Sequence, residues 1–423
     1  PLMPIKRSFQ SISSIRLRRT GAFVCSMRYA WFRYNASIGH ILGSLWLYSA
    51  KILLILKFAK SSLQKLCFFS FFALLIFLLS SECKKGCNFA TMKLHIFNPD
   101  HETAMAADKI PFTPPHAARE LRHDLGYIAA LWADDNDLIL VEDKETAKEA
   151  FRRTHIGSCR PVFIEPEHLS NILGHIQIDA ICPWGWNKVL KHQLLRWGLS
   201  GNVPLPEDAQ LDRWREMSGR AWAAENILSP LVSSSSRLVG EAAVVTTTEG
   251  ALEELEGQTA WVLKSPWSCS GRGVRYVKSG EADQHLRGWI ANVLSRQGYL
   301  MREPLYNKVL DLAVEFYAYR GRVEYQGLSL FETKNGAYTG NIIAPEERKV
   351  EMLSKYIDMD IVEGVTRDIA LLAQDNILPS YTGPFGVDMM VVRDGNNDVV
   401  LHPCVELNLR RTRCQRLKEN AKT

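Results

Sequence analysis

Four polar residues near the end of the chain have the types and the spacing of a divalent-metal site. Glu406, Asn408 and Arg410 alternate in one strand-like run, and Asp388 lies in a second such run upstream. Because side chains alternate between the two faces of a strand, the first three would share one face. Mg²⁺ prefers carboxylate and amide oxygens, and a guanidinium can hold a phosphate beside it. The pattern therefore favours ATP chemistry, with Asp388, Glu406 and Asn408 as metal ligands.

The segment between the two runs predicts how they meet. Residues 394–398 read Asp-Gly-Asn-Asn-Asp, so we expect the tight turn of a β-hairpin. A turn centred on Asn396 pairs Asp388 with Cys404 and places Asp388 diagonal to Glu406, on the same sheet face. A turn of even length would break this parity. Pro403 indicates an edge strand or a bulge that would also shift the register.

The first part of the body alternates short apolar runs with helical spacing. Such alternation predicts a parallel α/β domain, which we place at residues 92–205. The expected strands lie at residues 94–97, 137–141 and 176–182, and the expected helices at 115–125, 144–153, 166–173 and 186–197.

Strands dominate the second part, which we place at residues 206–423. A helical stretch at residues 208–227 and a loop of four serines at 233–236 come first. Antiparallel strands with separate helices then predict an α+β domain of two lobes, about 206–300 and 301–423, with a cleft between them. The expected strands lie at 260–264, 273–277, 298–302, 310–320, 323–331 and 386–392, and the expected helices at 283–295 and 346–374.

A candidate phosphate loop follows the strand that ends at Lys264. Small and hydroxylated residues in this loop would let backbone N–H groups approach phosphate oxygens, while Lys264 and Arg272 supply positive charge. The loop contains Ser268, Ser270, Gly271, Arg272 and Gly273. It is neither a Walker loop, since no Gly-Lys-Ser/Thr ends it, nor a dinucleotide fingerprint, since residue 276 is Tyr. Taken alone, an ordinary hairpin turn explains it equally well.

Taken together, these elements resemble the ATP-grasp superfamily in order and spacing over about residues 206–410. The elements are Lys264, the Ser/Gly loop, Glu303 after residues 299–302, Asp388 and the run Glu406-x-Asn408-x-Arg410. The resemblance implies that Lys264 contacts the phosphates or the adenine of ATP, that the 268–273 loop closes over the triphosphate, and that Glu303 binds ribose.

The same resemblance implies roles at the metal end. Asp388, Glu406 and Asn408 would hold Mg²⁺, with Mn²⁺ as an alternative, and Arg410 would steady the transferred phosphoryl group. Arg410 and Lys264 are thus the expected catalytic residues. Arg220 lies where relatives often have a second phosphate-binding lysine, and the α/β region looks like the preceding domain that helps to form the acceptor site.

An ATP- and Mg²⁺-dependent ligase is the function that this resemblance implies. A substrate carboxylate would attack the γ-phosphate to give an acyl phosphate and ADP, and an amine or similar nucleophile would then displace phosphate. Positioning and charge neutralisation suffice for this chemistry, so no covalent protein nucleophile is needed. A kinase on the same scaffold and a non-catalytic nucleotide-binding protein stay open. The expected partners are a small-molecule or peptide carboxylate and a nucleophile, with no nucleic acid.

Three loops are candidates for contact with the acceptor substrate. Residues 98–102 (Asn-Pro-Asp-His-Glu) follow the first strand, where open α/β sheets bind ligands, although a helix-capping turn explains them too. Residues 183–187 (Pro-Trp-Gly-Trp-Asn) could stack on a ligand or pack at a helix start. Residues 331–340 are either a polar hairpin tip or an acceptor loop.

The two ends of the chain differ from its body. Residues 1–91 have 13 Lys or Arg and one acidic residue, a net charge of +12, whereas residues 92–423 have a net charge of −7. We expect residues 1–91 to be an extension outside the folded enzyme and the protein to be cytoplasmic; the alternative is a membrane anchor or export signal at residues 51–80. Because few residues follow Arg411, we also expect a truncated or frameshifted C-terminus, which leaves the activity of this chain open.

The nine cysteines do not form a disulfide framework. Cys83 and Cys87 are the close pair, and their spacing matches no strong metal-binding pattern. Five other cysteines are far from one another in the sequence, which indicates buried free thiols in a reducing compartment. They are Cys159, Cys182, Cys269, Cys404 and Cys414.

Overall fold

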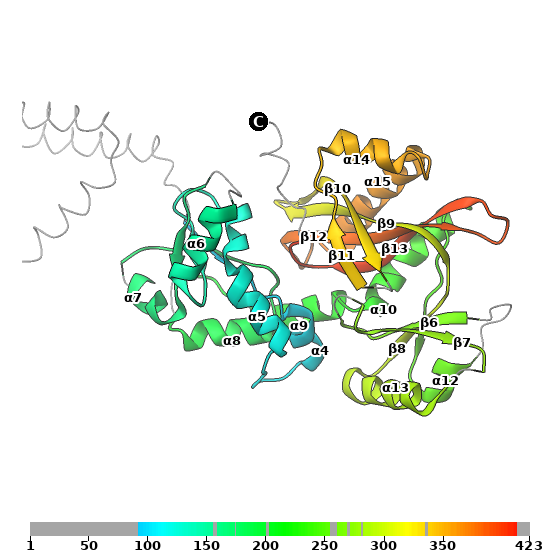
Figure 1. Cartoon of the computed structure of the whole chain (residues 1–423), viewed down its shortest axis with the longest axis horizontal. Coiled ribbons are helices and arrows are strands. Elements are labelled where there is room, and N and C mark those ends of the chain that lie inside the picture. Colours follow the sequence, from blue (N-terminus) through cyan, green and yellow to red (C-terminus); the bar gives the residue numbers. More distant parts are fainter. Residues whose placement is uncertain are drawn as a thin grey trace, which may run out of the picture. The chain divides into compact units, whose positions relative to one another are not determined.

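The structure is a computed structural model that describes residues 92–154, 159–173, 175–199, 203–253, 260–268, 271–280, 282–334 and 337–412 (Figure 1). These residues belong to one unit, Thr91–Thr423. The predicted extension at residues 1–91 and the predicted site residue Ser270 lie outside the described residues. Within the described part, no helix is both long enough and apolar enough to cross a membrane.

The N-terminal region contains a parallel sheet of four strands in the order β3-β2-β1-β4. The strands are β1 (Lys93–Ile96), β2 (Leu138–Leu140), β3 (Val162–Ile164) and β4 (Ala180–Pro183). Two apolar clusters involve these strands, as expected where helices cover both faces of a parallel sheet. The predicted parallel α/β region is therefore confirmed, with β3 as an additional short strand.

The helices of this region begin close to the predicted positions. In α8 (Lys188–Arg196) the side chain of Asn187 accepts a hydrogen bond from the backbone N–H of Leu190, which caps the first turn. An additional helix, α4 (His101–Ala107), follows β1 directly. The others are α5 (His116–Leu125), the 3₁₀ helix η1 (Gly126–Trp132), α6 (Lys144–Thr154), the 3₁₀ turn η2 (Pro166–His168) and α7 (Leu169–Leu173).

The helical stretch predicted at residues 208–227 is a series of shorter elements. Helix α9 (Asp208–Met217) ends before Gly219, after which the chain turns into α10 (Arg220–Ala223) and the π-helical turn η3 (Ala224–Leu228). Helix α11 (Ser229–Ser234) follows. The prediction of a loop at residues 233–236 was therefore wrong for its first half, because serines 233 and 234 form the last turn of α11.

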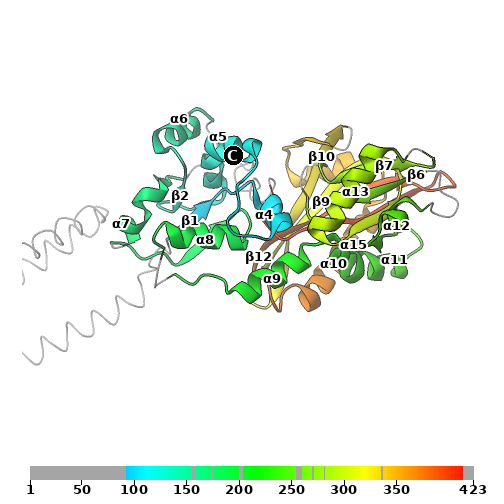
Figure 2. The ribbon, with the colours of Figure 1, turned by 90° about the horizontal axis from the view of Figure 1, so that it is seen from below.

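A small antiparallel sheet comes next, in the strand order β5-β8-β6-β7. Its strands are β5 (Ala243–Val245), β6 (Ala260–Lys264), β7 (Val274–Lys278) and β8 (Leu300–Pro304). Helices α12 (Thr248–Leu252) and α13 (Gln284–Gln297) pack on this sheet through a shared apolar core (Figures 1 and 2). The other face of β6 remains available for polar side chains.

The large antiparallel sheet has the order β11-β10-β9-β12-β13. Its strands are β9 (Asn307–Tyr319), β10 (Arg322–Lys334), β11 (Ala337–Asn341), β12 (Gly383–Arg393) and β13 (Val399–Asn408). Helices α14 (Glu346–Leu353) and α15 (Met359–Asn376) pack on it (Figure 1). The single helix predicted at residues 346–374 is therefore two helices, because the chain turns at residues 354–358.

Strand β13 lies at the edge of the large sheet but is partly covered. The backbone N–H of Val239 donates to the carbonyl of Leu401, and the N–H of Leu401 donates to the carbonyl of Arg237. Leu238 forms a parallel bridge with Leu401. The segment 237–239 therefore hydrogen-bonds to the side of β13 that faces away from β12.

The register of the β12–β13 hairpin differs from the prediction near the site. The turn is centred on Asn396 as expected, since Asp394 and Asp398 are hydrogen-bonded, and Met390 lies opposite His402. The register then shifts, and Asp388 lies directly opposite Glu406. The predicted partner, Cys404, lies in the bulged segment of β13 that also contains Pro403. The shift adds two residues to β13, so the shared face is preserved.

The fold class predicted from the sequence is confirmed: a parallel α/β sheet precedes two antiparallel sheets with separate helices. The small sheet ends with β8, and the large sheet begins with β9. The domain boundaries placed near residues 205 and 300 stay predictions.

Candidate functional site

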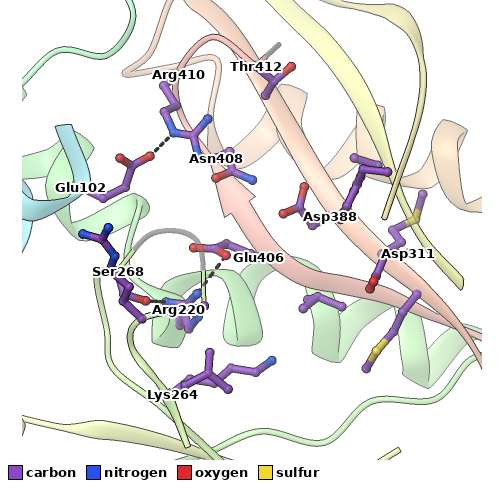
Figure 3. A pocket seen from close by; sticks show the side chains of 18 of the residues that line it. Glu102, Arg220, Lys264, Ser268, Asp311, Asp388, Glu406, Asn408, Arg410 and Thr412 are labelled. Carbon is purple, nitrogen blue, oxygen red and sulfur yellow. Dashed lines mark hydrogen bonds and ion pairs between the residues drawn. The ribbon is translucent and has the colours of Figure 1, made fainter. Parts of the chain in front are cut away.

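A cavity of about 410 Å³ gathers most of the residues that the sequence singled out (Figure 3). Its walls come from both antiparallel sheets, from helices α4, α5 and α10, and from the loops that follow β1 and β4. The predicted residues that line it are Arg220, Lys264, Ser268, Gly271, Arg272, Glu303, Asp388, Glu406, Asn408 and Arg410. Gly273 is not among the lining residues.

The three predicted metal ligands lie on one face of the large sheet. Asp388 on β12 is opposite Glu406 on β13, and Asn408 is opposite Gly386, one pair further along. Figure 3 shows Asp388 close to Asn408, whereas the carboxylate of Glu406 is turned towards Arg220. Burial raises the pKa of the Asp388 carboxyl to about 7, and the neighbouring Glu406 carboxylate acts in the same direction.

This donor set fits a hard divalent cation. Two carboxylates and one amide oxygen are the ligands that Mg²⁺ takes in proteins, and adjacent carboxylates repel each other unless a cation compensates them. The raised pKa of Asp388 expresses that repulsion together with burial. A bound cation would favour the ionised form of both groups.

Arg220 connects the large sheet to the candidate phosphate loop. Its guanidinium forms an ion pair of 2.8 Å with Glu406 and donates to the carbonyl oxygen of Ser265 at 2.8 Å and to the hydroxyl of Ser268 at 3.2 Å. The residue is 8 % exposed at the start of α10. It therefore brings a positive charge between the loop and the proposed metal ligands.

Lys264 and Glu303 form a buried ion pair on the small sheet. Lys264 ends β6, Glu303 lies on the adjacent strand β8, and the Nζ and Oε2 atoms are 2.5 Å apart. The two residues are 7 % and 5 % exposed. The sequence predicted both as nucleotide contacts, and the structure places both in the cavity wall.

The loop between β6 and β7 is closed tightly on itself. The N–H of Ser265 donates to the carbonyl of Gly273, and the N–H of Val274 donates to the carbonyl of Gly271. A Cβ atom added at Gly273 would lie 2.0 Å from Oγ of Ser265 and 2.4 Å from Cβ of Ser268. Gly273 is thus needed for the close packing of the loop rather than for direct lining of the cavity.

Arg410 meets the N-terminal region. It pairs with Glu102 on α4 (Figure 3), and its guanidinium carbon lies 5.6 Å from the ring centre of Trp184. The N–H of Arg411 donates to the carbonyl of Trp184 at 2.8 Å. The predicted phosphoryl-contacting arginine therefore lies at the junction between the large sheet and the N-terminal loops.

The first two candidate acceptor loops lie against each other. The amide of Asn98 donates to the carbonyl of Gly185 at 2.8 Å and accepts from its N–H at 3.3 Å. His101 and Asn187 are also hydrogen-bonded, at 3.1 Å. These buried contacts hold the loops together, and Pro99, Glu102 and Trp184 line the cavity.

The third candidate loop contributes little to the described cavity wall. Phe331 lines the cavity at its first position, and Asn341 does so just beyond its end. Residues 335 and 336 lie outside the described residues.

Sequence reasoning missed several polar residues of the cavity wall, among them Asp311, Glu315 and Thr412. Asp311 is paired with Lys308 at 2.6 Å. Glu315 is 3 % exposed, and burial raises its pKa to about 8. The run Asp311-x-Ala313-x-Glu315 in a predicted strand has the same period of two that identified Glu406 and Asn408, and this signal could have found the two acids.

The three cysteines within the described residues are free, as predicted: Cys159, Cys182 and Cys404. Burial raises the pKa of each thiol, which keeps it protonated and unreactive. The other cysteines lie outside the described residues.

Comparisons with known proteins give structural neighbours but no sequence match. No protein-family model and no curated protein matches the chain. N5-carboxyaminoimidazole synthetase from Staphylococcus aureus, complexed with ADP, is 14 % identical with a TM-score of 0.41, and the match covers 77 % of this chain and 73 % of that one. Biotin carboxylase from Campylobacter jejuni is 14 % identical with a TM-score of 0.44, covering 78 % and 67 %. D-cycloserine synthetase DcsG is 13 % identical with a TM-score of 0.38, covering 76 % and 92 %.

TM-scores below 0.5 do not define a fold, whereas this chain's own sheets and cavity do. Lys264 and its glycine-containing loop belong to one antiparallel sheet, and Asp388, Glu406 and Asn408 belong to a second. Both sets line one cavity, and a parallel α/β region precedes them. The described part of the chain therefore has the arrangement that the resemblance implies, with a parallel α/β region before two antiparallel sheets that share one cavity.

Proposed function

We propose that this protein is an ATP- and Mg²⁺-dependent ligase, which activates a substrate carboxylate as an acyl phosphate for attack by an amine or similar nucleophile. One observation supports the proposal above all others. A single cavity contains a carboxylate and amide set on one wall and basic residues with a tight serine and glycine loop on the other.

Each wall has its own task in the proposed reaction. Asp388, Glu406 and Asn408 would hold Mg²⁺, which supplies Lewis-acid neutralisation of charge on phosphate oxygens. Arg220 and Lys264 would bind phosphate oxygens, because both are buried cations that line the same space. Both are now paired with carboxylates, so a nucleotide would exchange these contacts for its own.

Arg410 would act where the phosphoryl group meets the acceptor. It lies between the sheet that contains the proposed metal ligands and the loops of the N-terminal region. Those loops and helix α5 add an apolar wall, which contains Phe97, Pro99, Ala118, Leu121 and Trp184. The acceptor would therefore present its carboxylate to Arg410 and its apolar part to this wall.

The proposal also implies the kinds of molecule that the protein would bind. A small-molecule or peptide carboxylate and a nucleophile would be the co-substrates, and no nucleic acid is involved. A cytoplasmic location and Mn²⁺ as an alternative ion stay predictions from the sequence.

An ADP-release screen tests the proposed function. The full chain is assayed with ATP and Mg²⁺ against carboxylates paired with amines. Glu406→Gln should lower turnover about 100-fold or more, because a metal ligand and its charge are lost. The control is Glu324→Gln, which removes a half-exposed carboxylate on β10 outside the cavity and should leave turnover unchanged.

Three outcomes would contradict the ligase assignment. Equal turnover by Glu406→Gln would remove the metal assignment. ADP release that needs no amine, with a stable phosphorylated product, would indicate a kinase instead. Tight ATP binding without ADP release under any acceptor mixture would indicate a non-catalytic nucleotide-binding protein.

A further inference from the structure

One tryptophan of the candidate phosphate loop lies behind the cavity wall rather than in it. Lys264 and Ser268 line the cavity, whereas Trp267 between them is not among the lining residues. Its half-buried indole ring contacts Arg215 and Tyr299 instead. The proposed nucleotide and metal contacts do not use this side chain.

Three contacts hold Trp267 in place. Its backbone N–H donates to Oε1 of Gln297 at 3.0 Å, and its indole N–H donates to the carbonyl of Arg215 at 2.9 Å. The guanidinium carbon of Arg215 lies 3.8 Å from the ring centre, which is within the range of a cation–π contact. Gln297 ends α13 and Arg215 lies in the last turn of α9, so the loop is held by two helices.

Arg215 is in turn bonded to the N-terminal region. Its Nε donates to the carbonyl of Met105 at 2.7 Å and lies 3.6 Å from a carboxylate oxygen of Asp108. Both partners lie at the C-terminal end of α4, where the helix dipole favours a positive charge. The same helix contains Glu102, which pairs with Arg410. Arg215 therefore joins the helix at the acceptor end of the cavity to the phosphate loop.

Trp267 also packs against the turn that leads into Arg220. A Cβ atom added at Gly219 would lie 3.3 Å from Cζ2 of Trp267 and 3.0 Å from the hydroxyl of Tyr299. Gly219 immediately precedes Arg220, which begins α10. Because glycine has no side chain, the backbone can approach both aromatic residues here. The indole therefore limits where α10 can begin.

Arg220 is bonded to the residues on both sides of Trp267. Its backbone N–H donates to the carbonyl of Pro266 at 3.3 Å. Its guanidinium donates to the carbonyl of Ser265 and to the hydroxyl of Ser268 (Figure 3). A displacement of the indole would move these three acceptors with the loop. The orientation of the Arg220 guanidinium therefore depends on Trp267.

We propose that Trp267 is a positioning residue for phosphate binding that acts through Arg220, and that Arg215 holds it in place. This inference rests on the proposed function and adds two residues that do not line the cavity. A loop and a guanidinium that are already ordered bind phosphate more tightly, because they lose less conformational freedom on binding.

Mg·ADP titrations of the full chain test the proposal. Trp267→Leu and Arg215→Met should each weaken the Kd of Mg·ADP about tenfold, because the loop loses a contact that orders it. Trp267→Phe should weaken it less, since phenylalanine keeps an aromatic face but lacks the indole N–H.

Trp289→Leu is the matched control. This tryptophan on α13 also lies beside an arginine, with the guanidinium carbon of Arg275 at 4.8 Å from its ring centre, but neither residue lines the cavity. The control should change the Kd of Mg·ADP less than about twofold, because it leaves the phosphate loop in place.

Two further measurements separate positioning from a structural role. Arg220→Lys keeps the charge but loses the guanidinium fork, so Trp267→Leu should weaken Mg·ADP less than about threefold in this background. In the free protein, Trp267→Leu should speed the hydrogen exchange of the bonded amides of Ser265 and Val274 about tenfold or more. Trp289→Leu should leave this exchange unchanged.

The proposal fails if either Trp267→Leu or Arg215→Met binds Mg·ADP as the wild type does; a lower melting temperature alone would then show a structural role. It also fails if Trp289→Leu weakens binding equally, or if Trp267→Leu has the same effect with Arg220 and with lysine there. If the wild type does not bind Mg·ADP, the proposed function is refuted, and the hydrogen exchange of the loop amides decides by itself whether Trp267 orders the loop.

Discussion

The pair formed by Lys264 and Glu303 shows how strongly a buried charge depends on its partner. Both side chains are more than nine-tenths buried, and their charged atoms are 2.5 Å apart. Lys264→Met should lower the free energy of unfolding by about 3–5 kcal/mol, because Glu303 is left as an unpaired buried charge. Urea denaturation at neutral pH measures the effect.

The double variant Lys264→Met/Glu303→Leu separates stability from binding. It should recover most of the lost free energy of unfolding, since no unpaired charge remains. Mg·ADP binding should be lost in the single and in the double variant, because both lack the lysine. A Lys264→Met protein as stable as the wild type would contradict the buried pair.

His402 gives the protein a sensitivity to acid. Its side chain is fully buried, neither ring nitrogen has a partner among the described residues, and burial together with the charge of Lys264 lowers its pKa to about 3. The unfolded state has a histidine pKa of about 6.5 and so binds more protons between these two values. The free energy of unfolding is therefore unaffected by His402 titration above about pH 6.5. It decreases as the pH falls from there towards 3.

His402→Leu should make the unfolding midpoint less dependent on pH. The variant should resemble the wild type near pH 7 and exceed its stability near about pH 4.5, where protonation of the unfolded wild type costs stability. Denaturant midpoints of both proteins across this range provide the measurement. Parallel pH profiles would show that His402 does not titrate as described.

The sequence predicted those site residues that are marked by a pattern within a few neighbouring positions. Glu406, Asn408 and Arg410 were found because they alternate in one strand-like run. Strand β13 ends at Asn408, so Arg410 lies just beyond it, yet all three residues line the cavity. The partners were not predictable in this way. Arg220 reaches Glu406 across nearly two hundred positions, and the burial of Glu315 depends on a glycine of another strand.

At the scale of elements, the β6–β7 loop provides a steric prediction. Gly273→Ala should weaken Mg·ADP binding about tenfold and lower the free energy of unfolding by about 1–3 kcal/mol, because the added methyl group overlaps Ser265 and Ser268. Isothermal titration and urea denaturation give the two values.

Gly288→Ala is the matched control for that loop variant. Gly288 lies on α13 with no atom within 4 Å of an added Cβ. Alanine is favoured over glycine inside a helix by about 0.5–1 kcal/mol, so this variant should be slightly more stable and should bind Mg·ADP normally. Equal behaviour of the two variants would contradict the tight packing at Gly273.

Helices and strands were predicted better than the breaks between neighbouring helices. Strand β6 was predicted with its observed bounds, because Ala260–Lys264 is a continuous run before a loop of turn-forming residues. The break between α14 and α15 was missed, although Asp358 caps α15 by accepting from the N–H of Asp360. Strands β3 and β5 have three residues each, too few to show a period.

At the scale of the whole molecule, Arg410 and Glu102 connect regions that are 308 positions apart. The two side chains are 19 % and 15 % exposed, so solvent screens their interaction only partly. A double-mutant cycle with Glu102→Gln and Arg410→Met should give a coupling free energy of about 1–3 kcal/mol. Urea denaturation of the four proteins supplies the values.

An exposed ion pair provides the comparison for this cycle. Arg213 and Glu216 on α9 are 2.7 Å apart, but their side chains are 43 % and 61 % exposed. The same cycle at this pair should give less than about 0.5 kcal/mol. If the Arg410–Glu102 coupling were as small, the pair would not hold the N-terminal loops against the large sheet.

A parallel region followed by antiparallel strands could be predicted, because the two kinds of strand differ in periodicity, but the contacts between the sheets could not. Parallel strands read as continuous apolar runs and antiparallel strands as alternating ones. The contact of Arg411 with Trp184 has no sequence signal, since it joins a backbone N–H to a backbone carbonyl of another region.

Because both edges of β13 are hydrogen-bonded, the strand should stay in place even if the turn that joins it to β12 is cut. The tip at Gly395 is exposed, with no atom near an added Cβ, whereas β13 is bonded to β12 on one side and to residues 237–239 on the other. A protease that cut the tip would leave two fragments that stay associated, with Asp388 still facing Glu406.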